Sequence, residues 1–180
     1  MTPQPGAPAS DLTNVVDALV STSRVLVALT ARSLGQLDVE ITLPQFRMLV
    51  VLASHGPQRT VDLAVELGVQ SSTVTRTCDR LVRKGMVRRA QRAGGDRRVA
   101  WIVLTEPGKE LVGEVMRRRR SELARLTGTI DIPQPAAVAA ALTALVEAAG
   151  EVPDPQWWDR WAICTDFDDS DVRAGADSVT

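Results

Sequence analysis

The chain has 180 residues, 44% of them hydrophobic, and a formal net charge of −1. This length suits one domain with a sizeable core, and an aromatic content of 3% with no Tyr predicts an aliphatic core of packed helices. Two cysteines are too few for a disulfide framework, and no phosphate-binding loop or cluster of catalytic residues indicates an enzyme.

The N-terminal third is predicted to be helical after a short arm. Residues 1–10 are rich in Pro and Ala, which predicts a disordered arm. From residue 11 to about 34, apolar residues recur at helical spacing and indicate one long helix. Thr42 and Gln45 have the spacing of a capping box, so a second helix is expected to start there and to end before Gly56.

Two short helices follow, separated by a tight turn. Thr60 is the expected N-cap of "VDLAVEL", and "GVQ" leads into "SSTVTRTCDRLVRKG". Two short helices joined by a three-residue turn containing Gly form a helix-turn-helix. On the second of them, a helical wheel gathers the residues expected to be buried, which are Val74, Cys78, Leu81 and Val82.

The opposite face of that helix is polar and cationic, with Ser72, Thr73, Arg76, Asp79, Arg80 and Arg83. A helix of ordinary width enters the major groove of B-DNA, where its N-terminal residues meet base edges. Arg76 suits a guanine edge, whereas Arg80 and Arg83 would reach phosphates. The alternative is a solvated helix face without a ligand.

After Gly85 the spacing changes to that of strands, in "MVRRAQ" and "VAWIVL". The Gly-Gly pair between them predicts a β-hairpin beside the second helix. Its tip would bring an arginine to the minor groove, and the candidates for this contact are Arg92, Arg97 and Arg98. Asp96 would orient Arg97 or Arg98 by a charge-assisted hydrogen bond. Residues 71–98 hold nine Lys and Arg against two acids, a net +7, which indicates double-stranded DNA as the partner.

In the C-terminal part a long helix is predicted from the cap Thr105 until Pro133 and Pro135 break it, and a last helix follows and ends at Gly150. The fold class expected is therefore mainly α with a small β-hairpin wing. A winged helix-turn-helix over 41–105 is flanked by long dimerisation helices in 11–40 and 106–150, whose apolar stripes exceed what the winged helix can cover. We expect a homodimer. The acidic segment 151–180 contains Trp157, Trp158 and Trp161, which we expect to pack onto the body.

From about residue 12 to 150 the chain resembles the multiple-antibiotic-resistance regulator (MarR) family, most sharply in "STVTR", "DRLVRKG", "DRR" and "LTEPG". The resemblance implies a homodimeric bacterial transcription factor, often a repressor of a pseudo-palindromic operator, released by a small aromatic or phenolic acid. By position it implies a wing partner for Asp79 and an effector pocket between the first, second and fifth helices. Arg47 is a candidate for the effector's carboxylate. The resemblance also implies major-groove contacts for Ser72, Thr73, Thr75 and Arg76, and places Arg97 and Arg98 on the wing.

Several further interpretations complete the sequence prediction. Cys78 is expected to be buried and inert, and His55 to cap a helix C-terminus. With one His and two distant Cys, neither a metal site nor a cofactor is expected. The N-terminus does not have the pattern of a signal peptide, so we expect a cytoplasmic, nucleoid-associated protein. The alternative function is a winged-helix module for protein contacts, without a specific operator.

Overall fold

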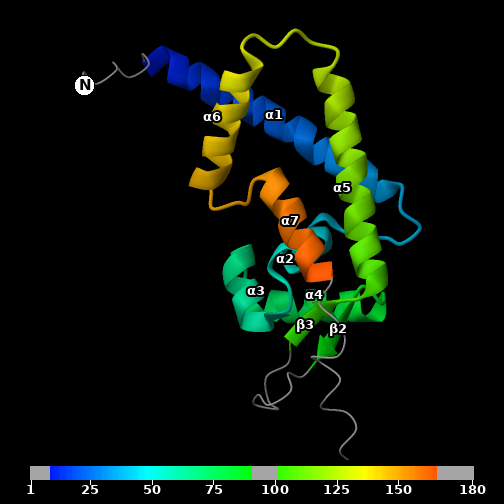
Figure 1. Cartoon of the computed structure of the whole chain (residues 1–180). Helices are drawn as coiled ribbons and strands as arrows, with labels where there is room; N and C mark the ends of the chain where they lie inside the picture. The colour runs from blue at the N-terminus through cyan, green and yellow to red at the C-terminus, as the bar shows by residue number, and fades with distance from the viewer. Residues whose placement is uncertain (1–8, 91–100, 166–180) are drawn as a thin grey trace, which may run out of the picture.

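The computed structural model describes residues 9–90 and 101–165. It confirms the fold class expected from the sequence, with helices above and a winged helix-turn-helix below in Figure 1. In chain order the elements are α1 (Ala9–Gly35), α2 (Leu43–His55), β1 (Gln58–Arg59), α3 (Thr60–Leu67), α4 (Ser71–Arg83), β2 (Val87–Ala90), β3 (Trp101–Leu104), α5 (Glu106–Thr127), α6 (Pro135–Ala148) and α7 (Asp154–Thr165).

The predicted N-caps of α2 and α5 are confirmed. The Thr42 side chain accepts from the backbone N–H of Gln45, and the Gln45 side chain accepts from the backbone N–H of Thr42, 3.1 Å away. At the start of α5, Thr105 Oγ1 accepts from the backbone N–H of Gly108 at 3.2 Å. These bonds satisfy N–H groups that a helix start leaves without an intrahelical partner.

The predicted N-cap of α3 was wrong. Thr60 is the first residue of the helix, and the N-cap is Arg59, whose side chain makes no capping bond. Arg59 instead forms a two-pronged ion pair with Asp62, with N···O distances of 2.6 and 2.7 Å. The helix therefore starts one residue earlier than the predicted cap implies, directly after Arg59 of β1.

The core of the winged helix forms where α2, α3, α4 and the sheet meet. Its fully buried side chains include Leu49, Leu52, Leu63, Val74, Leu81 and Ile102. The prediction that Val82 is also buried was wrong, because its side chain is 38% exposed. Val82 lies about 80° from Val74 on the helical wheel, at the edge of the apolar arc, and the core covers a narrower arc than that.

The sheet has three strands in the order β1-β3-β2, one more than the sequence predicts. β2 pairs antiparallel with β3, from Val87 opposite Leu104 to Ala90 opposite Trp101. The two-residue strand β1 pairs with the other edge of β3. The sequence gives no signal for β1, because two residues are too short to show alternation.

Gly108 explains why the "LTEPG" motif ends in glycine. A Cβ at this position would lie 2.1 Å from the carbonyl oxygen of Met86. The first turn of α5 therefore passes directly over the chain that leads into β2, which also brings Thr105 N within 3.1 Å of the same oxygen. A residue without a side chain is required for that approach.

The helix α7 lies within the segment 151–180 that the sequence left without an assigned structure. It packs on α2 and lies between the winged helix and the upper helices in Figure 1. Trp157 is 5% exposed and belongs to the hydrophobic core, so the expected packing of the tryptophans onto the body is confirmed. The chain thus adds a further core element after the long helices.

Candidate nucleic-acid interface

The helix-turn-helix is held by the turn between α3 and α4. Gly68 has φ of +63°, a left-handed conformation that favours glycine, and its N–H bonds to the carbonyl of Val65 at 3.1 Å. After the turn, the inner face of α4 packs into the core through Val74, Cys78 and Leu81, each with 0% exposure. The inner face is fixed in this way, and the opposite face points outward.

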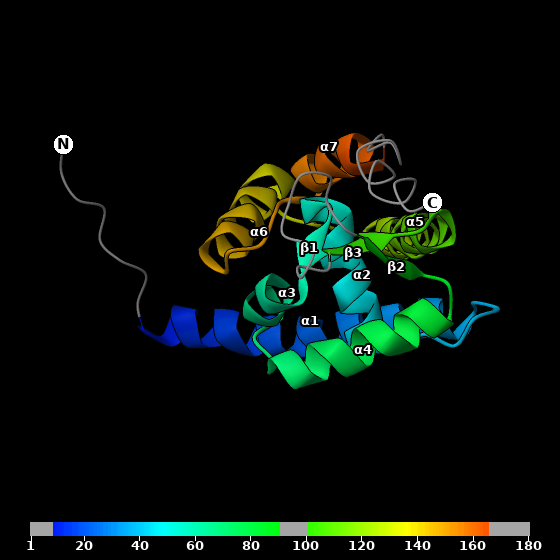
Figure 2. The ribbon, with the colours of Figure 1, turned by 90° about the horizontal axis from the view of Figure 1, so that it is seen from below.

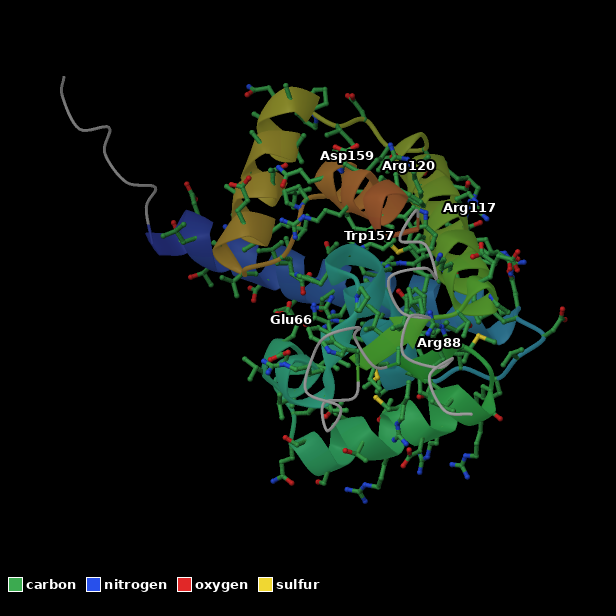
Figure 3. All side chains as sticks on the ribbon, turned by 60° about the horizontal axis from the view of Figure 1, so that its bottom comes forward. Glu66, Arg88, Arg117, Arg120, Trp157 and Asp159 are labelled. Carbon is green, nitrogen blue, oxygen red and sulfur yellow. The ribbon has the colours of Figure 1, made fainter. Side chains whose placement is uncertain are left out.

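The outward face of α4 is the one that the sequence predicts to contact DNA, and all of its candidate residues except Asp79 are exposed; these are Ser72, Thr73, Thr75, Arg76, Arg80 and Arg83. In Figure 2, α4 lies along an outer edge of the molecule, and in Figure 3 its side chains point away from the body. Arg76 Nε donates to the Ser72 carbonyl at 3.3 Å, which lays the side chain back towards the helix start. The residue as a whole remains exposed.

Asp79 joins α4 to the wing. Its Oδ1 accepts from Arg89 Nη2 at 2.6 Å, and Arg89 lies on β2 at the base of the hairpin. Both side chains are about half exposed. The sequence placed Asp79 opposite a wing arginine but did not single out Arg89, which appeared only as one of several cations in the strand. The pair fixes β2 against the helix that would enter the groove.

The remaining wing predictions lie outside the described residues. They concern the tip that follows β2, with Arg92, Asp96, Arg97 and Arg98. They stay predictions.

Lys84 belongs to the basic block but is used differently from the arginines on α4. Its ammonium donates to the carbonyl of Glu40 and lies 3.4 Å from Gln45 Oε1, so it ties the end of α4 to the start of α2. Close by, Thr105 Oγ1 donates to the Gly85 carbonyl at 2.5 Å. The cations of this region are thus divided between an outward face and internal bracing.

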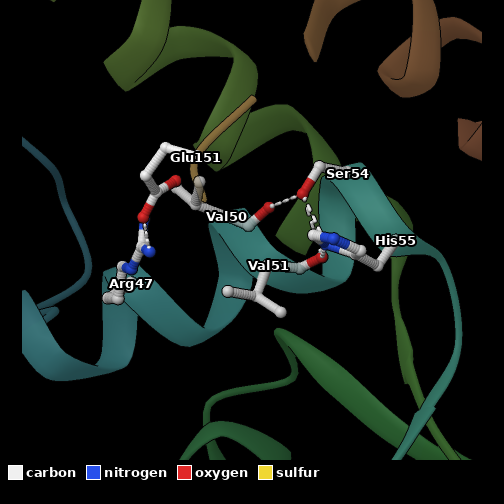
Figure 4. A network of polar contacts seen from close by, with 6 residues as sticks. All are labelled: Arg47, Val50, Val51, Ser54, His55 and Glu151. Carbon is white, nitrogen blue, oxygen red and sulfur yellow. Dashed lines mark hydrogen bonds and ion pairs between the residues drawn. The ribbon is translucent and has the colours of Figure 1, made fainter. Parts of the chain in front are cut away.

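Arg47 has an internal partner. Figure 4 shows its guanidinium against the carboxylate of Glu151, just before α7, and the two form an ion pair in which both side chains are nearly half exposed. The sequence offered Arg47 to the carboxylate of an effector, and that assignment stays a prediction. Within the described structure, the carboxylate at Arg47 comes from the chain itself.

A cavity of about 630 Å³ lies between α1 and α5. Seven of its eight lining residues are polar or charged, and three of them are arginines: Leu29, Arg32, Ser33, Gln36, Arg117, Arg118, Ser121 and Glu122. Arg118 is held by Glu114 and by Gln36 Oε1. Within the described part of the chain, neither Arg32 nor Arg117 forms an ion pair.

Cys78 is buried and His55 lies at the C-terminus of α2, as predicted for both. Burial raises the pKa of the Cys78 thiol to about 11, and its Sγ lies 3.6 Å from Met48 Sδ. His55 Nδ1 lies 3.2 Å from the Val51 carbonyl at the end of α2, and 2.9 Å from Ser54 Oγ (Figure 4). Among residues that the structure describes, no group of three or more His, Cys, Asp or Glu side chains is placed to hold a metal ion.

The fold and the outward face of α4 define a winged helix-turn-helix protein of the transcription-regulator class. The model of the MarR family matches residues 41–99. MdtR of Bacillus subtilis (strain 168), described as an HTH-type transcriptional repressor, is 30% identical over 116 residues, which cover 64% of this chain and 74% of MdtR. The crystal structure of RV1404 from Mycobacterium tuberculosis is 38% identical with a TM-score of 0.72, covering 83% of this chain and 99% of that one. The chain belongs to the MarR family.

A further relative is matched over a shorter region. The uncharacterized HTH-type transcriptional regulator YfiV of Bacillus subtilis (strain 168) is 32% identical over 87 residues, or 46% of this chain. The match spans about half of YfiV, 54% of its length. The similarity to this relative therefore concerns only part of each protein.

Proposed function

We propose that the protein is a homodimeric, sequence-specific DNA-binding transcriptional regulator that represses a pseudo-palindromic operator. The observation that carries this proposal is the exposed polar and cationic face of α4, opposite a face whose core residues are fully buried. Similarity to MdtR, a repressor by its description, supports the direction of regulation. The protein would act in the cytoplasm, on the nucleoid, and would have no enzymatic activity.

Binding would combine phosphate neutralisation with base reading by the region 41–105. Arg80 and Arg83 lie far enough along α4 to reach the sugar-phosphate backbone, and Arg76 lies near its start, where base edges are read. The wing would add an arginine in the neighbouring minor groove. The Asp79–Arg89 ion pair supports this arrangement, because it fixes the base of the wing beside the reading helix.

The apolar surface left on α1 and α6 supports a dimer. Exposed apolar side chains line the first two-thirds of α1, namely Leu12, Val15, Val16, Val20, Val25 and Val27. No residue of α6 is buried, although Val138, Leu142 and Leu145 are apolar. By length and composition alone, residues 10–35 could also cross a membrane. We assign this surface to a second copy of the chain, because contiguous apolar patches mark interfaces. Residues 11–40 and 106–150 of both copies would then form one dimerisation region.

A small acid, aromatic or phenolic, would release the DNA. The cavity between α1 and α5 supports this part of the proposal, since Arg32 and Arg117 line it and are not paired within the described chain. Salicylate is a suitable probe. Replacing Arg117 with Gln should weaken salicylate-induced release, whereas Arg24→Gln, on α1 but outside the cavity, should leave it unchanged. Equal responses of the two variants would place the effector elsewhere.

The experiment that tests the main function captures genomic fragments on the purified protein and compares them with random DNA in gel shifts at several salt concentrations. A specific regulator retains selected fragments against excess competitor, with an affinity that falls as salt rises. The alternative is a winged-helix module for protein contacts. Retention that ignores sequence, or no retention at low salt, would favour that alternative.

A further inference from the structure

The segment Glu151–Trp161, which we call the strap, contacts two parts of the molecule that would have different tasks in a regulator. Glu151 pairs with Arg47 on α2, inside the winged-helix lobe. Asp154, at the start of α7, pairs with Arg120 on α5, the long helix that leaves the lobe. Figure 3 shows Arg120 on α5 close to α7, and Figure 4 shows the bond to Arg47.

The tryptophans of the strap strengthen both contacts. Trp157 is in the core and stacks on Trp161, with ring centroids 5.5 Å apart and planes 24° apart. Trp161 lies against Gly113 of α5, where a Cβ would be 3.3 Å from its ring. Trp158 closes the cluster edge-on, 5.1 Å from Trp157. The rings contribute most of the binding, because half-exposed ion pairs stabilise little.

The position of the strap allows a small movement there to change the position of the DNA-reading helix α4. In Figure 2, α4 and α7 lie on opposite sides of the lobe with α2 between them, so a small rotation of the lobe on α5 displaces α4 by a larger distance. In a two-fold dimer, that displacement changes the separation of the two reading helices, which must match half-sites about one helical turn apart. A brace between lobe and α5 therefore selects a spacing.

We propose that the strap positions the winged-helix lobe on α5 and so determines which half-site spacing the dimer accepts. The proposal rests on the proposed function. Glu151, Asp154 and Trp161 are positioning residues, since they lie apart from the outward face of α4. The tool for testing it is the triple variant Glu151→Gln, Asp154→Asn, Trp161→Ala, which releases the strap but retains Trp157 in the core.

The first assay uses captured operator DNA in which the separation of the half-sites is varied by one and two base pairs in each direction. The natural protein should prefer one spacing by about tenfold or more, and the triple variant by less than about threefold, with an unchanged salt slope. A variant that merely unfolds more easily loses active protein equally for every spacing, so its preference would not change. An unchanged preference overturns the proposal.

The second assay needs no DNA, so it separates failure of this inference from failure of the proposed function. Spin labels at Val82→Cys on α4 and Ser121→Cys on α5, in a Cys164→Ser background, report the distance between lobe and helix by pulsed electron resonance. Releasing the strap should broaden the distance distribution. An unchanged distribution contradicts the proposal even if DNA binding is confirmed.

A matched control separates the strap from general loss of charge. Glu106→Gln removes a carboxylate from an ion pair with Lys109 within α5, without touching the strap. The double variant Glu151→Gln, Asp154→Asn retains all rings and covers the case in which the triple variant fails to fold. The double variant should show a smaller change of the same sign in both assays, and Glu106→Gln none. Equal effects in the double variant and the control would refute the role of the strap.

Discussion

Replacing Arg76 with Ala should reduce the preference of the protein for its operator over random DNA. Arg76 is exposed on the second turn of α4, and its Nε is bound to the Ser72 carbonyl, which leaves the terminal amines to form a fork on a guanine edge. Loss of such a contact costs about 1–3 kcal/mol of discrimination, or roughly 5- to 150-fold. Because a dimer carries the residue twice, the free-energy losses at two separated half-sites should approximately add.

The assay measures dissociation constants for operator and random duplexes at several salt concentrations, for the natural protein, Arg76→Ala and Arg80→Ala. Arg80, one turn further along α4, is the matched control, because it is expected to contact phosphate. Loss of a phosphate contact in both subunits lowers the slope of log affinity against log salt by about 1.8 and weakens all sequences alike. If Arg76→Ala behaves in this way, with its preference intact, the assignment of base reading to Arg76 is refuted.

Three further predictions concern packing, reactivity and assembly. Gly108→Ala should lower the free energy of unfolding, measured in urea, by about 1–3 kcal/mol, because its Cβ would lie 2.1 Å from a backbone carbonyl oxygen. Gly35→Ala is the control and should not destabilise the protein, because nothing lies within 4 Å of its Cβ position. Equal effects of the two variants would contradict the close approach at Gly108. In a Cys164→Ser background, Cys78 should stay unreactive towards a thiol reagent at pH 8, because burial raises its pKa to about 11 and only the thiolate reacts; fast labelling at that pH would contradict the burial. Val20→Asp, on the exposed face of α1, should convert the dimer to monomers in sedimentation velocity, and an unchanged sedimentation coefficient would exclude this face from the interface.

Much of the fold could be predicted because its signals are local. The capping box of Thr42 and Gln45, the cap at Thr105 and the left-handed turn at Gly68 each depend on residues within a few positions of one another. The buried residues Val74, Cys78 and Leu81 follow from helical periodicity. The same reasoning failed at the margins of elements, at the N-cap of α3 and at the edge of the buried arc of α4, where the tertiary environment decides.

The contacts that the sequence could not assign join residues far apart in the chain. Arg47 meets Glu151 across 104 positions, and Lys84 reaches back 44 positions to the Glu40 carbonyl. Many carboxylates and arginines are chemically equivalent partners, so composition and spacing do not select among them. Sequence alone therefore determined most of the helices, the two strands of the hairpin, the greater part of the buried face of α4 and its cationic face, whose causes lie within one or two helical turns. Only the tertiary structure decided that Arg89 holds Asp79 and that α7 braces α2 to α5, because pairing at long range depends on how the elements pack.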